Sequence, residues 1–179
     1  MKLFKRLLLI LLVLVALIAI VSQVLPGHYR VERSTVIAAT PDAIFPQINA
    51  PKNWNNWSAW NPASYPDMQQ TFTGPESGVG ATSTWDGKST GQGTYTITQS
   101  DPARGIAYDL AMEHGSFRSK GEFAFTPGPD GTRVVWSDEG DLSRNPMHRI
   151  VGLFLDKMLG PDFEKGLANL KTQLEQPKK

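Results

Sequence analysis

An uninterrupted apolar run near the amino terminus places the strongest limit on what this chain can fold into. The fifteen residues 7–21 are all apolar, and the run continues with a mild interruption to Leu25. A helix over residues 7–25 would be about 28 Å long at 1.5 Å per residue, which matches the hydrocarbon core of a bilayer. Because nothing on the run itself is polar, we favour a transmembrane helix over a buried core helix. Pro26-Gly27 should end this helix.

The charges before the run predict its orientation. Lys2, Lys5 and Arg6 precede it, and residues 1–25 contain no acid. Positively charged flanks stay on the cytoplasmic side of a membrane. We therefore expect residues 1–26 to be a single-pass anchor in the inner (cytoplasmic) membrane, with a cytoplasmic N-terminus and residues 27–179 as a periplasmic or otherwise extracytoplasmic domain. A cleaved signal peptide is the alternative, although no small-x-small cleavage site follows the run.

The rest of the chain is close to neutral. Of the 18 basic residues in the chain, 15 follow residue 25 together with all 17 acidic residues, which leaves a net charge of −2. Nucleic-acid binding needs concentrated basic surface, so we expect no nucleic-acid partner. The absence of Cys excludes disulfides, a thiolate nucleophile and a Cys-ligated zinc site. The His residues lack ligand spacing, and there is no phosphate-binding loop or dinucleotide fingerprint, so we expect neither a metal nor a cofactor.

Short segments in which apolar and polar residues alternate follow one another through most of the domain. This period of two, with turn residues such as Asp86-Gly87 and Asp101-Pro102 between segments, predicts an antiparallel sheet with one solvated face. The expected strands are residues 29–38, 67–74, 80–86, 91–100, 104–112, 116–126 and 132–142. Two short helices, residues 42–49 and 51–57, should lie between the first two strands, because Thr40-Pro41 is typical of a helix start.

The C-terminal part has the pattern of a long helix. Apolar residues recur at helical spacing from Met147 to Leu174, after a start at Pro146. Gly160-Pro161 predicts a kink or brief break, which would be either the hinge of a lid or a plain joint between helices. These elements predict an α+β fold in which a curved seven-stranded antiparallel sheet wraps on the long C-terminal helix.

Several motifs, taken in order, resemble a known superfamily. They are ATPDAIF at residues 39–45, NWNNWSAW at 53–60, GVGA at 78–81, GTRVVW at 131–136 and DFEKGLANLK at 162–171. Over residues 30–176 the chain resembles the START/SRPBCC superfamily, with its helix-grip fold of the birch-pollen-allergen type, and most of all the bacterial branch labelled polyketide cyclase/dehydrase-like or lipid-transport-like. The resemblance implies a helix-grip fold. It does not imply one reaction, because members include lipid carriers, hormone receptors and aromatase/cyclases.

The aromatic and apolar residues expected to face the inside are the candidate ligand-binding side chains. Trp54 and Trp57 share a helical face, and with Trp60 they would either wall a pocket or plug one end of the curled sheet. Large and small residues share the inner face, which fits close packing as well as a cavity, and the resemblance favours the cavity. The full set of candidates is Trp54, Trp57, Trp60, Phe72, Trp85, Tyr95, Tyr108, Leu110, Phe117, Phe123, Trp136, Phe154 and Met158.

A few polar side chains are also expected to point inward. A carboxylate such as Asp138 in an apolar cavity needs a partner or a raised pKa. His148 or Arg149, at the start of the long helix, would be within reach of it and would make a general acid/base pair possible. Asp138, Tyr108 and His148 are therefore the candidate catalytic residues. The alternative is that Asp138 is solvated near a strand end or belongs to an acidic rim with Glu139 and Asp141.

These observations favour a binding module that holds a small hydrophobic ligand, such as a lipid, isoprenoid or aromatic metabolite, between sheet and helix. A cyclase or dehydratase that uses the same cavity is one alternative, and a packed structural or interaction domain is another. Convergent polar groups and a perturbed carboxylate would favour the enzyme, whereas a filled core with an exposed apolar patch would favour the interaction domain. The sequence leaves the ligand and the oligomeric state open.

Overall fold

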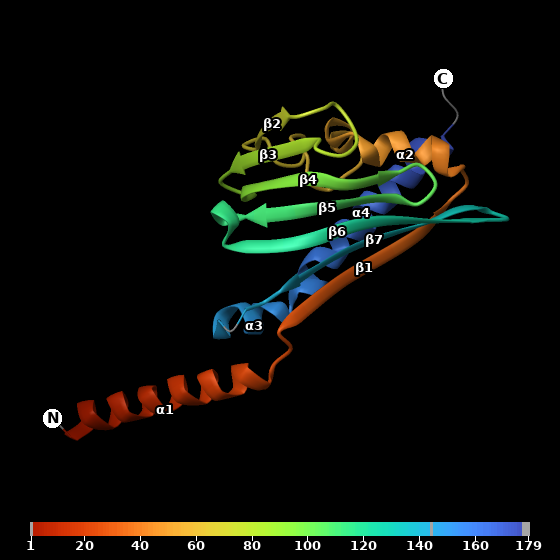
Figure 1. Ribbon diagram of the computed structural model, residues 1–179. Helices are drawn as coiled ribbons and strands as arrows, with labels where there is room; N and C mark the ends of the chain where they lie inside the picture. The colour runs from red at the N-terminus through yellow and green to blue at the C-terminus, as the bar shows by residue number, and fades with distance from the viewer. Residues whose placement is uncertain (1, 144, 177–179) are drawn as a thin grey trace.

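Seven strands form one antiparallel sheet in the order β1-β7-β6-β5-β4-β3-β2 (Figure 1). The computed structural model describes residues 2–143 and 145–176, with the side chains of residues 3–18, 24–143 and 145–176. The strands are β1 (His28–Ile37), β2 (Gln69–Thr73), β3 (Thr82–Gly87), β4 (Gly91–Asp101), β5 (Gly105–Met112), β6 (Phe117–Gly128) and β7 (Gly131–Asp141). The helices are α1 (Lys2–Val24), α2 (Pro41–Asn49), η1 (Pro51–Asn56), η2 (Glu113–Gly115), α3 (Pro146–Gly152) and α4 (Leu155–Glu175). The expected α+β class and seven-stranded sheet are confirmed.

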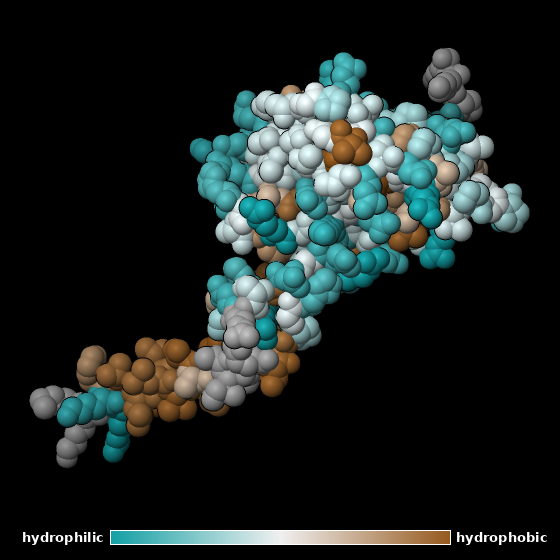
Figure 2. Space-filling model, viewed as in Figure 1, coloured by the Kyte–Doolittle hydropathy of each residue, from teal (hydrophilic) through white to brown (hydrophobic). Residues whose placement is uncertain are grey.

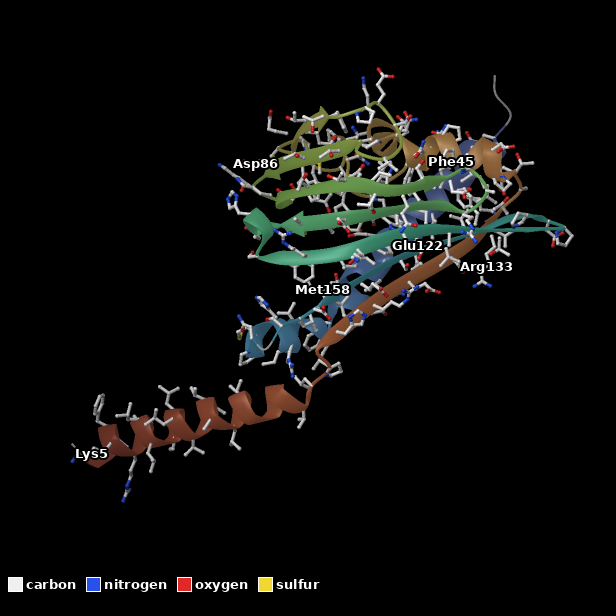
Figure 3. All side chains as sticks on the ribbon, viewed as in Figure 1. Lys5, Phe45, Asp86, Glu122, Arg133 and Met158 are labelled. Carbon is white, nitrogen blue, oxygen red and sulfur yellow. The ribbon has the colours of Figure 1, made fainter. Side chains whose placement is uncertain are left out.

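The two faces of the sheet differ as the alternating pattern predicts. On β1, Tyr29 and Val31 are buried on the inner face, whereas Arg30 and the other outward residues are exposed. The outer face carries charged side chains such as Glu122 and Arg133, which project from the ribbon in Figure 3. A strand with one wet face buries every second residue, so the sheet needs a cover on its inner side alone.

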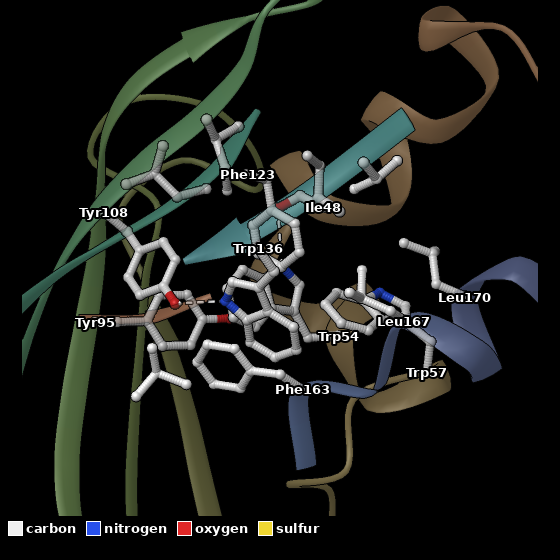
Figure 4. Close-up of a cluster of buried hydrophobic side chains, with 14 of the residues drawn as sticks. Ile48, Trp54, Trp57, Tyr95, Tyr108, Phe123, Trp136, Phe163, Leu167 and Leu170 are labelled. Atoms are coloured by element: carbon white, nitrogen blue, oxygen red, sulfur yellow. Dashed lines mark hydrogen bonds between the residues drawn. The ribbon is translucent and has the colours of Figure 1, made fainter. Parts of the chain in front are cut away.

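That cover is α4, which runs behind the sheet in the view of Figure 1. Its buried residues include Phe163, Leu167 and Leu170. Phe163 stacks on Trp136 of β7 with the two ring centroids 4.1 Å apart, and both rings belong to the apolar core drawn in Figure 4. A long C-terminal helix gripped by an antiparallel sheet fits the helix-grip fold.

The break in the C-terminal helix lies elsewhere than expected. It falls at residues 153–154, between α3 and α4, and Gly160-Pro161 lies inside α4, so the expected break there is wrong. Arg33 of β1 forms ion pairs with Asp156 at 2.8 Å and Glu164 at 2.6 Å, on either side of this dipeptide. A Cβ atom at Gly160 would overlap the Arg33 guanidinium. The absence of a side chain at Gly160 therefore allows the Arg33 side chain of β1 to lie directly against α4.

The N-terminal helix α1 extends away from the domain, with Lys5 near its remote end and an apolar surface along its length (Figures 2 and 3). Arg149 of α3 donates a 3.2 Å hydrogen bond to the carbonyl of Leu25, just after α1. The expected transmembrane helix is not confirmed: among the described residues, no helix is both long and apolar enough to cross a membrane. The expected span, residues 7–25, includes residues 19–23, whose side chains lie outside the described ones.

Candidate functional site

A cavity of about 450 Å³ lies between the inner face of the sheet and the first half of α4. Its walls come from all seven strands, from η1 and the loop before β2, and from η2, α3 and α4. The lining is predominantly apolar and rich in aromatic rings. Volumes of about 300–1,000 Å³ are usual for sites that hold small molecules, so the fold leaves room for a ligand.

Most of the residues chosen from the sequence line this cavity. They are Trp54, Trp60, Trp85, Tyr95, Tyr108, Leu110, Phe117 and Trp136, together with the polar candidate Asp138. Those on the strands converge because a strand places alternate side chains on the same inner face, and Trp54 and Trp60 are brought in by η1 and the segment after it.

The other candidates lie outside the cavity lining. Trp57 and Phe123 are fully buried in the core. Phe72 is 38 % exposed and borders a second, more polar hollow beside η1. Phe154 and Met158 are more than half exposed.

Phe154 and Met158 were expected on the cavity side of the C-terminal helix, but the neighbouring face of that helix lines the cavity. The cavity is lined instead by Leu155, Leu159 and Phe163, which follow one another at intervals of four residues. The sequence contains two neighbouring apolar stripes. The start of α4 at Leu155 decides which stripe faces the sheet, and no sequence signal marks that start.

Some lining residues were missed by the sequence reasoning. They are Tyr29, Ser58, Tyr65, Met68, Gln70, Ser89, Thr90, Met112, Glu113 and Val151, in addition to the α4 residues above. Tyr29 carried a usable signal, because it lies two residues before Val31 on the first strand and so shares its inner face. Tyr65 carried none, because it lies in an irregular segment without periodicity, whereas Met68 lies in the strand expected over residues 67–74.

The tryptophans divide between the two roles that the sequence left open. Trp54 stacks on Tyr95 with ring centroids 4.5 Å apart, lines the cavity and donates its indole N–H to the carbonyl of Ile48 at 2.8 Å. Trp57 is fully buried and donates its indole N–H to the carbonyl of Gln47 at 3.0 Å. Trp54 is thus a cavity wall, and Trp57 is a core plug.

The hydroxyl of Tyr108 is held in a fixed position at the cavity. The indole N–H of Trp136 donates to it at 2.9 Å, as the dashed line in Figure 4 shows. Its ring lies over Gly121 of β6, where a Cβ atom would overlap it. Burial raises the pKa of Tyr108, so the hydroxyl keeps its proton. Among the described residues this proton has no acceptor, and it is available to a ligand.

Asp138 is the polar centre of the cavity. It is 3 % exposed, and it accepts hydrogen bonds from the hydroxyl of Tyr29 at 2.5 Å and from that of Ser119 at 2.9 Å. Burial raises the pKa of its carboxyl group to about 6, although both hydrogen bonds oppose the shift. The alternatives of a solvated Asp138 or an acidic rim are wrong.

His148 does not come to Asp138. Its Nδ1 lies 3.4 Å from Oγ of Ser143, on the exposed segment that leads into α3. The partners of the buried carboxyl group are hydroxyls, so the expected contact between Asp138 and His148 is not present. Within the part of the chain that the structure describes, no three His, Asp or Glu side chains gather where they could hold a metal ion.

Comparison with known proteins agrees with this architecture. The model of a family described as "Polyketide cyclase / dehydrase and lipid transport" matches residues 28–175, which is nearly the whole of the domain. The chain belongs to this family. The resemblance to the wider SRPBCC superfamily is thereby confirmed.

Several solved structures have the same fold as this polyketide cyclase/dehydrase family member. Protein CV1439 from Chromobacterium violaceum is 14 % identical, with 85 % of this chain and 100 % of that chain covered and a TM-score of 0.58. The di-domain ARO/CYC StfQ of the steffimycin biosynthetic pathway is 13 % identical, with 83 % and 51 % covered and a TM-score of 0.62. At such identities the likeness shows the fold alone. No curated protein matches the chain.

Proposed function

We propose that this family member binds a small hydrophobic molecule, such as a lipid, isoprenoid or aromatic metabolite, in the cavity between the sheet and α4. The observation that carries the proposal is the cavity itself: about 450 Å³ of space lined mainly by apolar and aromatic side chains. Burial of apolar ligand surface is worth about 25 cal/mol per Å² before the costs of binding, so such a cavity favours an apolar ligand. The lipid-transport members of the family support this proposal.

The test compares two tryptophan substitutions on consecutive residues of α4. Leu159 lines the cavity, whereas Met158 is 59 % exposed beside it. A neutral naphthalene-type dye, whose emission rises in an apolar site, is titrated into the wild-type protein and both variants. We expect Leu159→Trp to weaken dye binding at least about tenfold by filling the cavity, and Met158→Trp to leave it unchanged. Equal binding by both variants, or no binding by the wild type, contradicts the proposal.

A second candidate function, proton transfer on the bound molecule, is favoured by Asp138. A carboxyl group with a pKa of about 6 in an apolar cavity is poised as a general acid or base near neutral pH. The hydroxyl of Tyr108, another lining residue, adds a donor to the same cavity. A cyclase-type or dehydratase-type reaction needs such groups, and the di-domain ARO/CYC neighbour belongs to a biosynthetic pathway.

A generic substrate tests this second function without knowledge of the natural one. A base that removes the ring C–H proton of a nitrobenzisoxazole breaks its N–O bond and releases a coloured cyanophenolate. We expect the wild-type rate to rise with pH through about 6 as Asp138 ionises. Asp138→Asn should abolish this reaction, and Glu139→Gln, which alters the exposed neighbour, should not. An equal rate in Asp138→Asn would exclude Asp138 as the base.

We further propose that residues 7–25 anchor the domain in the inner (cytoplasmic) membrane, with the N-terminus in the cytoplasm and the domain in the periplasm. The apolar run, its basic flank and the exposed apolar side chains of residues 7–18 support this proposal. The test is alkaline extraction of membranes from cells that make the full chain with C-terminal alkaline phosphatase. We expect the protein in the pellet with an active phosphatase, and a variant with Leu11→Arg and Leu14→Arg in the supernatant. Release of the wild type by alkali would contradict the anchor.

A further inference from the structure

We propose that the preferred ligand of this cavity is a hydrophobic cation, an amphiphilic or aromatic amine whose ammonium group contacts Asp138. This inference rests on the proposed binding function and specifies the chemical class of the ligand.

The described charges around the cavity all have one sign. Among the described residues, the charged ones in its lining are Asp138 and Glu113, and none is a Lys, Arg or His. The α4 side contributes apolar side chains, among them Leu155, Leu159 and Phe163. An anionic ligand would therefore enter an apolar space that already holds a carboxylate and would find no opposite charge there.

Asp138 itself has no cationic partner in the part of the chain that the structure describes. None of the ion pairs among the described residues includes it, and the charge that perturbs it most is that of Glu139, which has the same sign. Its two hydrogen bonds come from neutral hydroxyls of β1 and β6, Tyr29 and Ser119. A carboxylate has about four lone-pair sites, so two remain for further donors. A buried carboxylate without a counter-ion is costly, and a bound ammonium group would supply one.

Two further features of the lining suit an ammonium group. The side-chain oxygen of Gln70 is buried with no hydrogen-bond partner among the described residues, so it is a second acceptor at the cavity. The rings of Trp54 and Trp60 also line the space, whereas the ring of Trp136 is stacked between Phe163 and Phe123. Aromatic faces attract a desolvated cation through their quadrupoles, and aromatic cages around ammonium groups are a recurrent use of this attraction.

The experiment compares three probes that share one decyl chain and differ in the head group: decylamine, decanol and decanoate. The full chain is kept in solution at about pH 8 with a nonionic amphipathic polymer, and binding is followed by calorimetry with the polymer alone as background. We expect decylamine to bind at least about tenfold more tightly than decanol, and decanoate to bind most weakly. This ranking needs no variant, so it stands even if a substitution impairs folding.

Two matched variants then assign the preference to a residue. Asp138→Asn should reduce decylamine binding to the level of decanol and leave decanol binding unchanged. Glu139→Gln removes a neighbouring acid whose side chain is 41 % exposed and paired with Arg30 at 2.6 Å, so it should bind all three probes like the wild type. Decanoate binding as tight as that of decylamine, or an equal loss of all probes in Asp138→Asn, would overturn the cation proposal while the binding function stands. Failure of all three probes to bind would overturn the binding function as well.

Discussion

The hydroxyl of Tyr29 on β1 donates a 2.5 Å hydrogen bond to Oδ1 of Asp138 on β7, across a sequence separation of 109 residues. The bond joins the first strand of the domain to the last at the floor of the cavity. It is charge-assisted whenever Asp138 is ionised, and such bonds are about twice as strong as neutral ones. Tyr29 therefore partly offsets the cost of the buried carboxylate.

The stability of the protein should depend on the ionisation of Asp138. Burial raises its pKa from 3.8 to about 6, so between these values the native state binds more protons than the unfolded state. The free energy of unfolding must then fall as pH rises through this window, by about 3 kcal/mol for a shift of about two pH units. Denaturant unfolding of the wild type and of Asp138→Asn between about pH 4 and pH 8 measures this effect.

The difference between the two proteins isolates Asp138 from the other titrating groups. Asp138→Asn should gain relative stability as pH rises, whereas Glu139→Gln, which removes a charge that raises the pKa of Asp138, should keep the wild-type dependence with its midpoint moved slightly to lower pH. A constant difference between wild type and Asp138→Asn across the range would mean that the carboxyl group titrates normally.

Removal of the Tyr29 hydroxyl should affect Asp138 more than folding in general. Tyr29→Phe deletes a hydrogen bond that lowers the pKa of Asp138, so this pKa should rise further in an NMR titration of the carboxyl carbon. The loss of stability should be about 1.5–3 kcal/mol at about pH 8 and smaller at about pH 4, where the carboxyl group is neutral. Tyr65→Phe is the matched control, because its hydroxyl makes no hydrogen bond among the described residues. Equal effects of the two substitutions at both pH values would argue against this role of Tyr29.

Gly121 should be irreplaceable where it lies under the ring of Tyr108. Gly121→Ala places a Cβ atom on that ring, so Tyr108 must shift away from Trp136. We expect a loss of about 1–3 kcal/mol in unfolding free energy and a changed near-ultraviolet circular dichroism spectrum. Gly128→Ala on the same strand meets only an ordinary van der Waals contact and should change stability by less than about 0.5 kcal/mol. Similar losses in both variants would mean that strand propensity, and not the ring, causes the effect.

Trp57 in the core and Trp60 in the cavity wall should respond differently to truncation. Trp57→Ala empties a fully buried site and should cost about 3–5 kcal/mol of stability. Trp60→Ala removes a partly buried ring from the cavity lining, so it should cost less stability and instead alter dye binding. Chemical denaturation and dye titration of both variants decide this. Comparable destabilisation by the two substitutions would place Trp60 in the core.

The fold could be predicted well from the sequence where one physical signal dominated. Most strands have one buried and one wet face, so alternation indicated the sheet and the inward side of residues such as Trp136, although β2 has no buried residue. The C-terminal helix was harder, because Gly160-Pro161 has the composition of a break. The ion pairs of Arg33 with Asp156 and Glu164 lie on either side of that dipeptide, and a contact between residues more than 120 apart leaves no local signal.

The site could be predicted only in part, for a similar reason. Alternation on the strands identified the aromatic walls and Asp138, but it could not show which apolar stripe of α4 faces them. The hydroxyl partners of Asp138 come from β1 and β6, and their convergence depends on strand order. The sequence offered His148 as a partner because it is close along the chain, whereas the sheet supplies Tyr29.

The pairing of β1 with β7 also has a consequence for the order of events during synthesis. The ladder joins His28 to Asp141 and Ile37 to Thr132, so β1 has no partner strand until residues 132–141 of the 179 have been made. Contacts this distant in sequence slow folding, because the closure entropy of a long loop must be overcome before they form. The helix α1 leaves the ribosome first, but the sheet cannot be completed before β7 is available to pair with β1. The domain should therefore reach its folded state only after translation has ended.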